Sequence, residues 1–134
     1  MARRLILDTG ILVAAERGTT TLDEVIAEDD DLVIAAITVA ELRTGVELAT
    51  KRHRAARADF VRKILETVPV EPYDVATADA HARLLASVHR AGTQRGAQDL
   101  IIAATAVATD RTVLTTDRTA NWQDLPGVSC LVVP

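Results

Sequence analysis

Leu5-Ile6-Leu7-Asp8-Thr9-Gly10 is the stretch that decides the fold, because a short apolar run is followed by an acidic residue and a turn. Three consecutive aliphatic residues indicate a buried strand, and Thr9-Gly10 marks the point where the chain leaves the sheet. Strands buried on both faces are typical of a parallel sheet covered by helices. Asp8 then lies just past the end of its strand, at the edge where open α/β folds bind ligands.

The rest of the chain continues this alternation. Apolar runs predict strands at residues 32–37, 113–114 and 128–133, the last at the sheet edge, and a short proline-interrupted strand at 68–71. Apolar residues at helical spacing predict helices at residues 21–28, 38–49, 51–67, 75–91 and 98–109. Strands that alternate with helices predict an α/β fold with a mostly parallel central sheet, right-handed crossovers and helices on both faces.

Length and composition set further bounds. A chain of 134 residues fits one domain, which we place at residues 1–134. Apolar residues make up 49% of it, but Phe60, Tyr73 and Trp122 are the only aromatic residues, so aliphatic side chains must fill the core. Cys130 is the only cysteine, which excludes an internal disulfide and a zinc site built on several thiolates, and fits a reducing cytoplasm. No apolar stretch approaches the roughly 20 residues of a membrane helix, so we expect no membrane partner.

Charge is distributed unevenly along the chain. The net charge of −4 provides no general attraction to nucleic acid. Residues 51–63, however, include six basic residues and a single acid, Asp59. This segment is either a solvated helix face or a surface that contacts phosphate groups.

Four acidic residues are predicted to meet at one edge of the sheet. Asp8 and Asp117 each follow a strand, so both lie at the carboxyl edge. Crossover helices begin at that same edge, which places Glu41 in the first turn after the strand at 32–37. Asp99 lies at the start of the helix that precedes the strand at 113–114. All four carboxylates are therefore expected where open α/β folds place their ligands.

Each acid also has a purely structural alternative. Asp8 can cap the following helix. Thr38 and Glu41 match a capping box, in which the glutamate reaches back to a free backbone N–H. Asp99 can be stabilised by the dipole of its helix, and Asp117 can be an ordinary turn residue. The convergence of all four favours a site, because clustered carboxylates repel one another and raise each other's pKa unless a cation neutralises them.

The expected ligand set consists of oxygen atoms. Hydroxyl groups of Thr9, Thr115 and Thr116 stand close to the acids in sequence. Such a set favours Mg²⁺ or Mn²⁺ over zinc or copper. The three histidines are predicted to lie on helices away from this edge, at positions 53, 81 and 89.

Four short motifs, taken together, suggest a known family. They are Leu-Asp-Thr at 7–9, Ala-Glu-Leu at 40–42, Asp-Leu-Ile-Ile-Ala-Ala at 99–104 and Leu-Thr-Thr-Asp at 114–117, the last followed by Trp122. This arrangement resembles the PIN-domain ribonucleases, specifically the toxins of VapBC toxin-antitoxin modules. The resemblance spans nearly the whole chain. Gly10 departs from the Asn or Ser frequent in that family, and Trp122 stands where Phe is common.

The resemblance implies a function, a cofactor and partners. It implies a metal-dependent endoribonuclease with Asp8, Glu41, Asp99 and Asp117 as catalytic and metal-binding residues. Mg²⁺, or Mn²⁺, would be the cofactor. The implied substrate is structured RNA, either tRNA or rRNA, and the implied partners are a VapB-like antitoxin and a second copy of the chain. We hypothesise that Asp8 and Asp99 bind the ion directly and that Glu41 or Asp99 takes the proton of the attacking water.

Supporting roles are expected for further residues. Thr9 and Thr116 are candidates for holding the acids, and the basic residues expected to contact RNA are Arg43, Lys51, Arg54 and Arg95. The same arginines can instead pair with an antitoxin or with acidic residues of the chain.

Other function classes remain as alternatives. Asp8-Thr9-Gly10 is also the signature of aspartic proteases, but those are built of strands, and this chain is rich in helical pattern. A dehalogenase-like phosphotransferase would need a second acid two residues after Asp8, where Gly10 stands. The more serious alternative is a non-catalytic PIN-fold module that binds RNA or protein without cutting. The RNA target, the antitoxin and the number of metal ions do not follow from the sequence.

Overall fold

A central parallel sheet carries the site-forming residues of this protein. The structure is a computed structural model, and it describes residues 2–134. Five strands pair in the order β3-β2-β1-β4-β5, and every pairing is parallel. The elements follow one another as β1 (Arg4–Leu7), α1 (Thr9–Glu16), α2 (Leu22–Val25), β2 (Asp31–Ala35), α3 (Ala36–Glu47), α4 (Lys51–Thr67), β3 (Val70–Glu71), α5 (Val75–Ala91), α6 (Ala97–Ala108), β4 (Thr112–Thr115), the short 3₁₀ helix η1 (Trp122–Asp124) and β5 (Ser129–Val132). The predicted α/β class and parallel sheet are confirmed.

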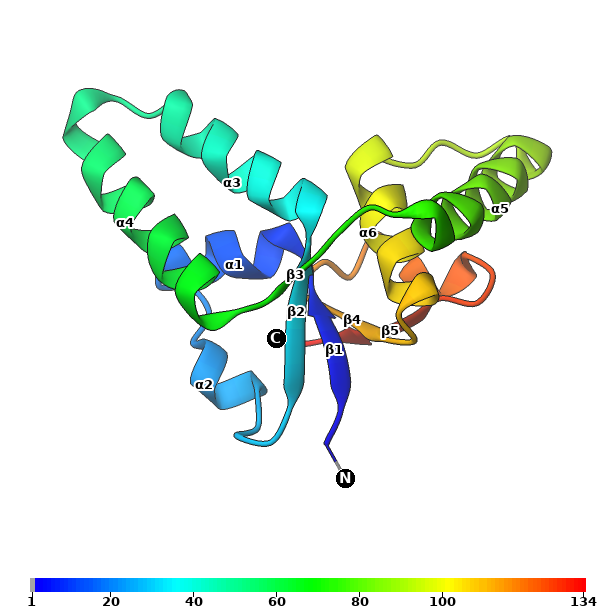
Figure 1. The fold of residues 1–134 in the computed structure, drawn as a ribbon, viewed down its shortest axis with the longest axis horizontal. Helices are drawn as coiled ribbons and strands as arrows, with labels where there is room; N and C mark the ends of the chain where they lie inside the picture. Colours follow the sequence, from blue (N-terminus) through cyan, green and yellow to red (C-terminus); the bar gives the residue numbers. More distant parts are fainter. Residues whose placement is uncertain (1) are drawn as a thin grey trace.

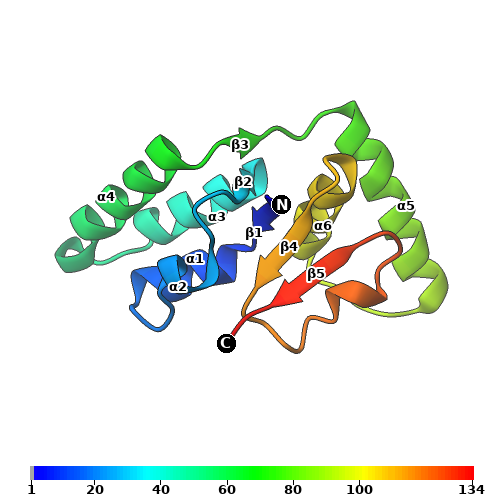
Figure 2. The same cartoon turned by 90° about the horizontal axis from the view of Figure 1, so that it is seen from below.

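Helices cover both faces of the sheet. In Figure 1, α1, α3 and α4 lie on one side of the strands, and α5 and α6 lie on the other. Figure 2, seen from below, shows β4 and β5 side by side, with β5 at the open edge. None of the helices in residues 2–134 combines the length and the apolar character needed to cross a membrane.

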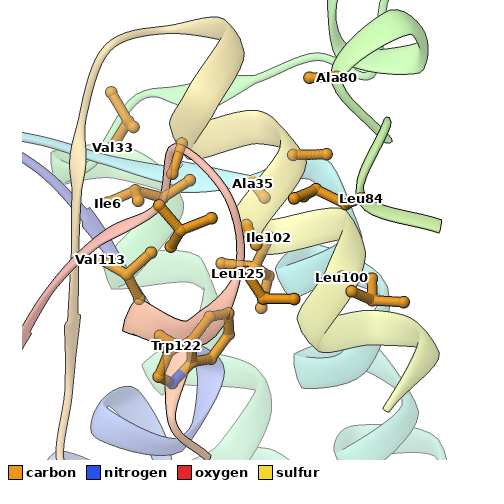
Figure 3. Close-up of a cluster of buried hydrophobic side chains, with 14 residues drawn as sticks. Ile6, Val33, Ala35, Ala80, Leu84, Leu100, Ile102, Val113, Trp122 and Leu125 are labelled. Carbon is orange, nitrogen blue, oxygen red and sulfur yellow. The ribbon is translucent and has the colours of Figure 1, made fainter. Parts of the chain in front are cut away.

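Alternation along the strands divides the core into two layers. Successive strand residues point to opposite faces, so each strand contributes to both layers. Ile6, Val33 and Val113 pack under α5 and α6 in one cluster (Figure 3). Leu5, Leu7, Ile34 and Leu114 pack against α1, α3 and α4 in the other. This double burial explains why the strands are continuous apolar runs rather than alternating patterns.

Two predicted elements differ most from the structure in their bounds. The strand predicted at 32–37 ends at Ala35, and α3 begins at Ala36. Ile37 is apolar because it packs against the core from the first turn of a helix, and apolar character alone does not separate that position from a strand. The helix predicted at 21–28 is a single turn, α2. The acidic run at 28–31 follows it, and acids at a helix C-terminus oppose the helix dipole.

Candidate active site

Asp8 lies at the junction of β1 and α1 and is held from two sides. Its backbone N–H donates to the carbonyl oxygen of Leu114 at 3.0 Å, which extends the pairing of β1 with β4. Its Oδ2 accepts a hydrogen bond from the hydroxyl of Thr115 at 2.8 Å, and only 7% of the residue is exposed. Asp8 occupies the N-cap position of α1, but its side chain makes no capping hydrogen bond. Burial raises the pKa of the Asp8 carboxyl, and the backbone N–H groups of Gly10 and Thr9 act against that rise, as in a weak capping interaction.

Glu41 is brought to Asp8 by a threonine between them. The hydroxyl of Thr9 donates to Glu41 Oε1 at 2.8 Å and lies 3.0 Å from the hydroxyl of Thr38. Ala35, not Thr38, is the N-cap residue of α3. The predicted capping box therefore does not form, because the helix starts earlier than expected and Glu41 lies beyond its first turn. Thr9 instead fixes one carboxylate oxygen of Glu41 beside the end of β1.

Asp99 sits in the first turn of α6, as predicted. Gly96 is the N-cap residue, and a Cβ at that position would lie 3.3 Å from Asp99 Oδ2. Glycine therefore leaves room for the carboxylate at the start of the helix. The position also lets the helix dipole act on Asp99, so this structural alternative is compatible with a site role.

Asp117 follows β4 and closes a small turn. Its Oδ1 accepts hydrogen bonds from the backbone N–H of Thr119 at 2.8 Å and from the Thr119 hydroxyl at 2.7 Å. Its own N–H donates to the hydroxyl of Thr115 at 3.0 Å. The turn alternative is correct for Asp117, and the turn also sets the place of its carboxylate.

The four acids line one hollow at the carboxyl edge of the sheet. α3 and α6 both begin at this edge in Figure 1. The volume of the hollow is about 540 Å³. It is lined by Asp8, Thr9, Gly10, Val13, Ala14, Arg17, Thr19, Glu41, Asp99, Thr116 and Asp117. The four acids that were predicted to converge therefore line the same hollow, together with Thr9 and Thr116.

The acids are not assembled as a finished ligand set. Within residues 2–134, no three side chains of His, Cys, Asp or Glu are grouped closely enough to hold a metal ion. Instead, threonine hydroxyls donate to the carboxylates of Asp8, Glu41 and Asp117. The sequence predicted the neighbourhood of the acids but not this competition from hydroxyl groups.

Electrostatic repulsion is strongest at Asp99. Burial, together with the charges of Asp8, Glu41 and Asp117, raises the pKa of Asp99 to about 6. Burial also raises the pKa of Asp8 and of Glu41, against the hydrogen bonds from Thr115 and Thr9. Hydrogen bonds from Thr119 lower the pKa of Asp117. A crowded set of oxygen donors whose charges oppose one another suits a hard divalent cation such as Mg²⁺ or Mn²⁺.

The basic residues predicted to contact RNA are dispersed. Arg54 donates to the carbonyl oxygens of Glu47 and Ala49, where it closes the end of α3. Arg43 lines a separate hollow between α3 and α4. Lys51 is exposed at the start of α4. None of these three lines the hollow of the acids.

Arg17 is a site residue that the sequence reasoning missed. It is the only basic residue that lines the hollow, and it also lines a smaller one of about 130 Å³ beside it. Both hollows share Val13 and Glu41. Arg17 is the C-cap residue of the eight-residue helix α1. Its spacing was the signal that could have located it, because Gly10, Val13 and Arg17 are three and four residues apart and therefore share one face of the helix.

The comparison with protein families settles which family this is. Residues 5–124 match the PIN domain. The chain belongs to the PIN domain family. This PIN domain protein is 26% identical over 131 residues to a protein named Ribonuclease VapC from Rickettsia bellii, covering 97% of this chain and 96% of the relative. It is 36% identical over 115 residues to Ribonuclease VapC5 from Mycobacterium tuberculosis, covering 84% and 82%.

A solved structure supports the same placement of this PIN domain protein. The structure of VapBC-5 from Mycobacterium tuberculosis, a member of the VapBC family of toxin-antitoxin systems, matches with a TM-score of 0.79 and 28% identity. The match covers 97% of this chain and 98% of that one. Trp122, where the family resemblance leads one to expect Phe, is 2% exposed and belongs to the core cluster against which Cys130 of β5 also packs.

Proposed function

We propose that this PIN domain protein is a metal-dependent endoribonuclease and the toxin of a type II toxin-antitoxin pair. One observation carries the proposal: four carboxylates from four separate parts of the chain line a single hollow, in a protein whose relatives are named ribonucleases. The substrate class is structured RNA, either tRNA or rRNA. A VapB-like antitoxin and a second copy of the chain are the proposed partners, and the cytoplasm is the proposed location.

Asp8 and Asp99 are the residues that would hold the metal ion, with Glu41 and Asp117 beside them. When bound, Mg²⁺ or Mn²⁺ would polarise the scissile phosphate and lower the pKa of a water molecule. Thr115 and the β1–β4 pairing hold Asp8 in place. A site built on strand ends is rigid, which favours a fixed geometry during the reaction.

Glu41 is the better candidate for accepting the proton of the attacking water. Thr9 occupies its Oε1, and no hydrogen bond within residues 2–134 involves its Oε2. Burial raises the pKa of Glu41, as a general base requires, and Asp99, whose pKa is also raised, would be engaged with the metal ion. Thr9 would therefore orient the carboxylate and leave its second oxygen for the proton.

A cleavage assay tests this function directly. We expect the purified protein to cut tRNA or rRNA when Mg²⁺ or Mn²⁺ is present and to stop when EDTA removes the metal. The products should carry a 5′ phosphate and a 3′ hydroxyl, as the family resemblance implies. RNA binding without cleavage in either metal would instead support the non-catalytic module.

Arg17 is expected to contact a phosphate group of the RNA. Each phosphate contact contributes a slope of about −0.7 for single strands, and about −0.9 for a duplex, to the dependence of log affinity on log salt concentration. Arg17→Ala, in an Asp8→Asn background that prevents cleavage, should therefore make that slope less steep by the amount that one phosphate contact contributes. The measurement is RNA binding across a salt series.

An arginine elsewhere on the surface serves as the comparison. Arg83 lines a shallow hollow beside α5, away from the acids. If Arg83→Ala changed the slope as much as Arg17→Ala, the effect would reflect total charge rather than a contact at the site.

A further inference from the structure

Arg95 joins two loops beside the acids. It lies in the connection between α5 and α6, one residue before Gly96. Its Nη1 donates to the carbonyl oxygen of Ala120, and its Nη2 donates to that of Asn121 at 3.2 Å. The partners are 25 and 26 residues away in sequence. Both terminal nitrogens of Arg95 therefore bind the backbone of the loop that carries Asp117. The contact of this side chain with RNA stays a prediction.

The loop that Arg95 binds, residues 117–121, is held together by its own hydrogen bonds. Asp117 accepts two hydrogen bonds from Thr119, and the side-chain amide of Asn121 donates to the carbonyl oxygen of Thr119 at 3.2 Å. Asn121 adopts a left-handed backbone conformation with φ of 51°, which directs the chain into the buried Trp122. We therefore expect a displacement at residues 120–121 to reach Asp117, because hydrogen bonds through Thr119 join these residues.

Arg95 is also close in sequence to Asp99, at the start of α6. Gly96, the next residue, is the N-cap of α6, and the space at its missing Cβ is limited by Asp99 Oδ2. Arg95 and Gly96 therefore each affect the position of one acid, Asp117 or Asp99. One ties down the loop of Asp117, and the other leaves room for Asp99.

We propose that Arg95 is a positioning residue that fastens the Asp117 loop to the start of α6, so that Asp99 and Asp117 keep a fixed relation in the hollow. The inference rests on the proposed function, because it concerns acids that would share a metal ion. In this role Arg95 acts through the backbone carbonyl oxygens of Ala120 and Asn121.

The effect on metal affinity distinguishes this role from simple charge. A guanidinium near a cation site repels the cation. If the charge of Arg95 were its only effect, removing the side chain would strengthen metal binding. Loss of a clamp would weaken binding instead, because the acids would have to be ordered at the moment of binding. Partners that orient metal ligands typically contribute 10–100-fold to affinity.

The experiment compares Arg95→Ala and Arg95→Lys with a control, Arg90→Ala. Arg90 is exposed near the end of α5 and lines a shallow hollow away from the acids. Mn²⁺ alone is titrated into each protein. We expect Arg95→Ala to raise the dissociation constant about tenfold, and Arg95→Lys nearly as much, since lysine keeps the charge but lacks the planar fork that reaches two carbonyl oxygens. Arg90→Ala should leave it unchanged.

Trp122 provides a readout that needs neither metal nor activity. It is the only tryptophan, and it follows directly on the clamped loop. Acrylamide quenching of its fluorescence should increase in Arg95→Ala and in Arg95→Lys but not in Arg90→Ala. Far-UV circular dichroism of Arg95→Lys, the milder variant, checks that the fold is kept.

Failure of the clamp and failure of the proposed function are distinguishable. Unchanged quenching together with unchanged or tighter Mn²⁺ binding in Arg95→Ala would overturn the clamp, as would wild-type behaviour of Arg95→Lys. A wild-type protein that neither binds Mn²⁺ nor cuts RNA would overturn the proposed function, while the quenching comparison would still decide whether Arg95 holds the loop.

Discussion

Asp8→Asn is expected to reduce RNA cleavage by about a hundredfold or more while leaving the protein folded. A bound metal contributes several kcal/mol to stabilising the charge of a transition state, and each 1.36 kcal/mol corresponds to about a tenfold change in rate. Asn has the shape of Asp and keeps an oxygen that can accept the hydrogen bond from Thr115. It removes the negative charge that would attract the ion.

The structure offers a matched control for this substitution. Asp79 is an exposed aspartate on α5 and does not line the hollow. Asp79→Asn removes the same charge and should cleave RNA at the wild-type rate. Initial rates with saturating Mg²⁺ and the melting temperature with EDTA are the two measurements. Full metal-dependent cleavage by Asp8→Asn would show that the acid hollow is not the catalytic centre.

The approximate positions of the acids followed from chain order and topology. A parallel sheet with crossover helices has one carboxyl edge, so residues after strands and at helix starts must collect there. Asp8, Glu41, Asp99 and Asp117 obey that rule, and all four line the hollow. The rule does not need side-chain detail, which is why it succeeds with sequence alone.

What could not be predicted depends on side-chain direction. The pattern around Thr38 and Glu41 fits a capping box equally well until the first residue of α3 is known, and hydropathy leaves that boundary uncertain by about two residues. Arg95 has the same charge whether it faces solvent or binds two carbonyl oxygens. Arg17 enters the hollow because of where α1 ends. Each of these facts depends on which residues the folded chain brings into contact, and residue type alone does not reveal that.

The acid cluster is also expected to make the metal-free protein less stable as pH rises. The pKa of Asp99 is about 6 in the folded protein and 3.8 as an ordinary aspartate. Between these values the folded state binds more protons than the unfolded state, so stability falls as pH rises from about 4 through 6 and then levels off. The raised pKa values of Asp8 and Glu41 act in the same direction. Lowered pKa values, such as that of Asp117, affect stability only at more acidic pH.

Asp99→Asn isolates this effect. Because Asp99 is only half-buried, solvent screening reduces the loss in free energy of unfolding that its charge causes to about 1 kcal/mol. For a chain of this size that corresponds to about 3 °C in melting temperature. With EDTA, the variant should gain stability relative to wild type between pH 4 and 7, and Asp79→Asn should not. With Mg²⁺ at pH 7.5 the order should reverse, since the wild type binds the ion in its folded state only and the variant has lost a ligand. Melting curves across pH, with and without Mg²⁺, test both parts. In the metal-free protein the charge of Asp99 repels the neighbouring acids, and in the metal-bound protein the same charge attracts the ion. If Mg²⁺ stabilised Asp99→Asn as much as wild type, Asp99 would not be holding the ion.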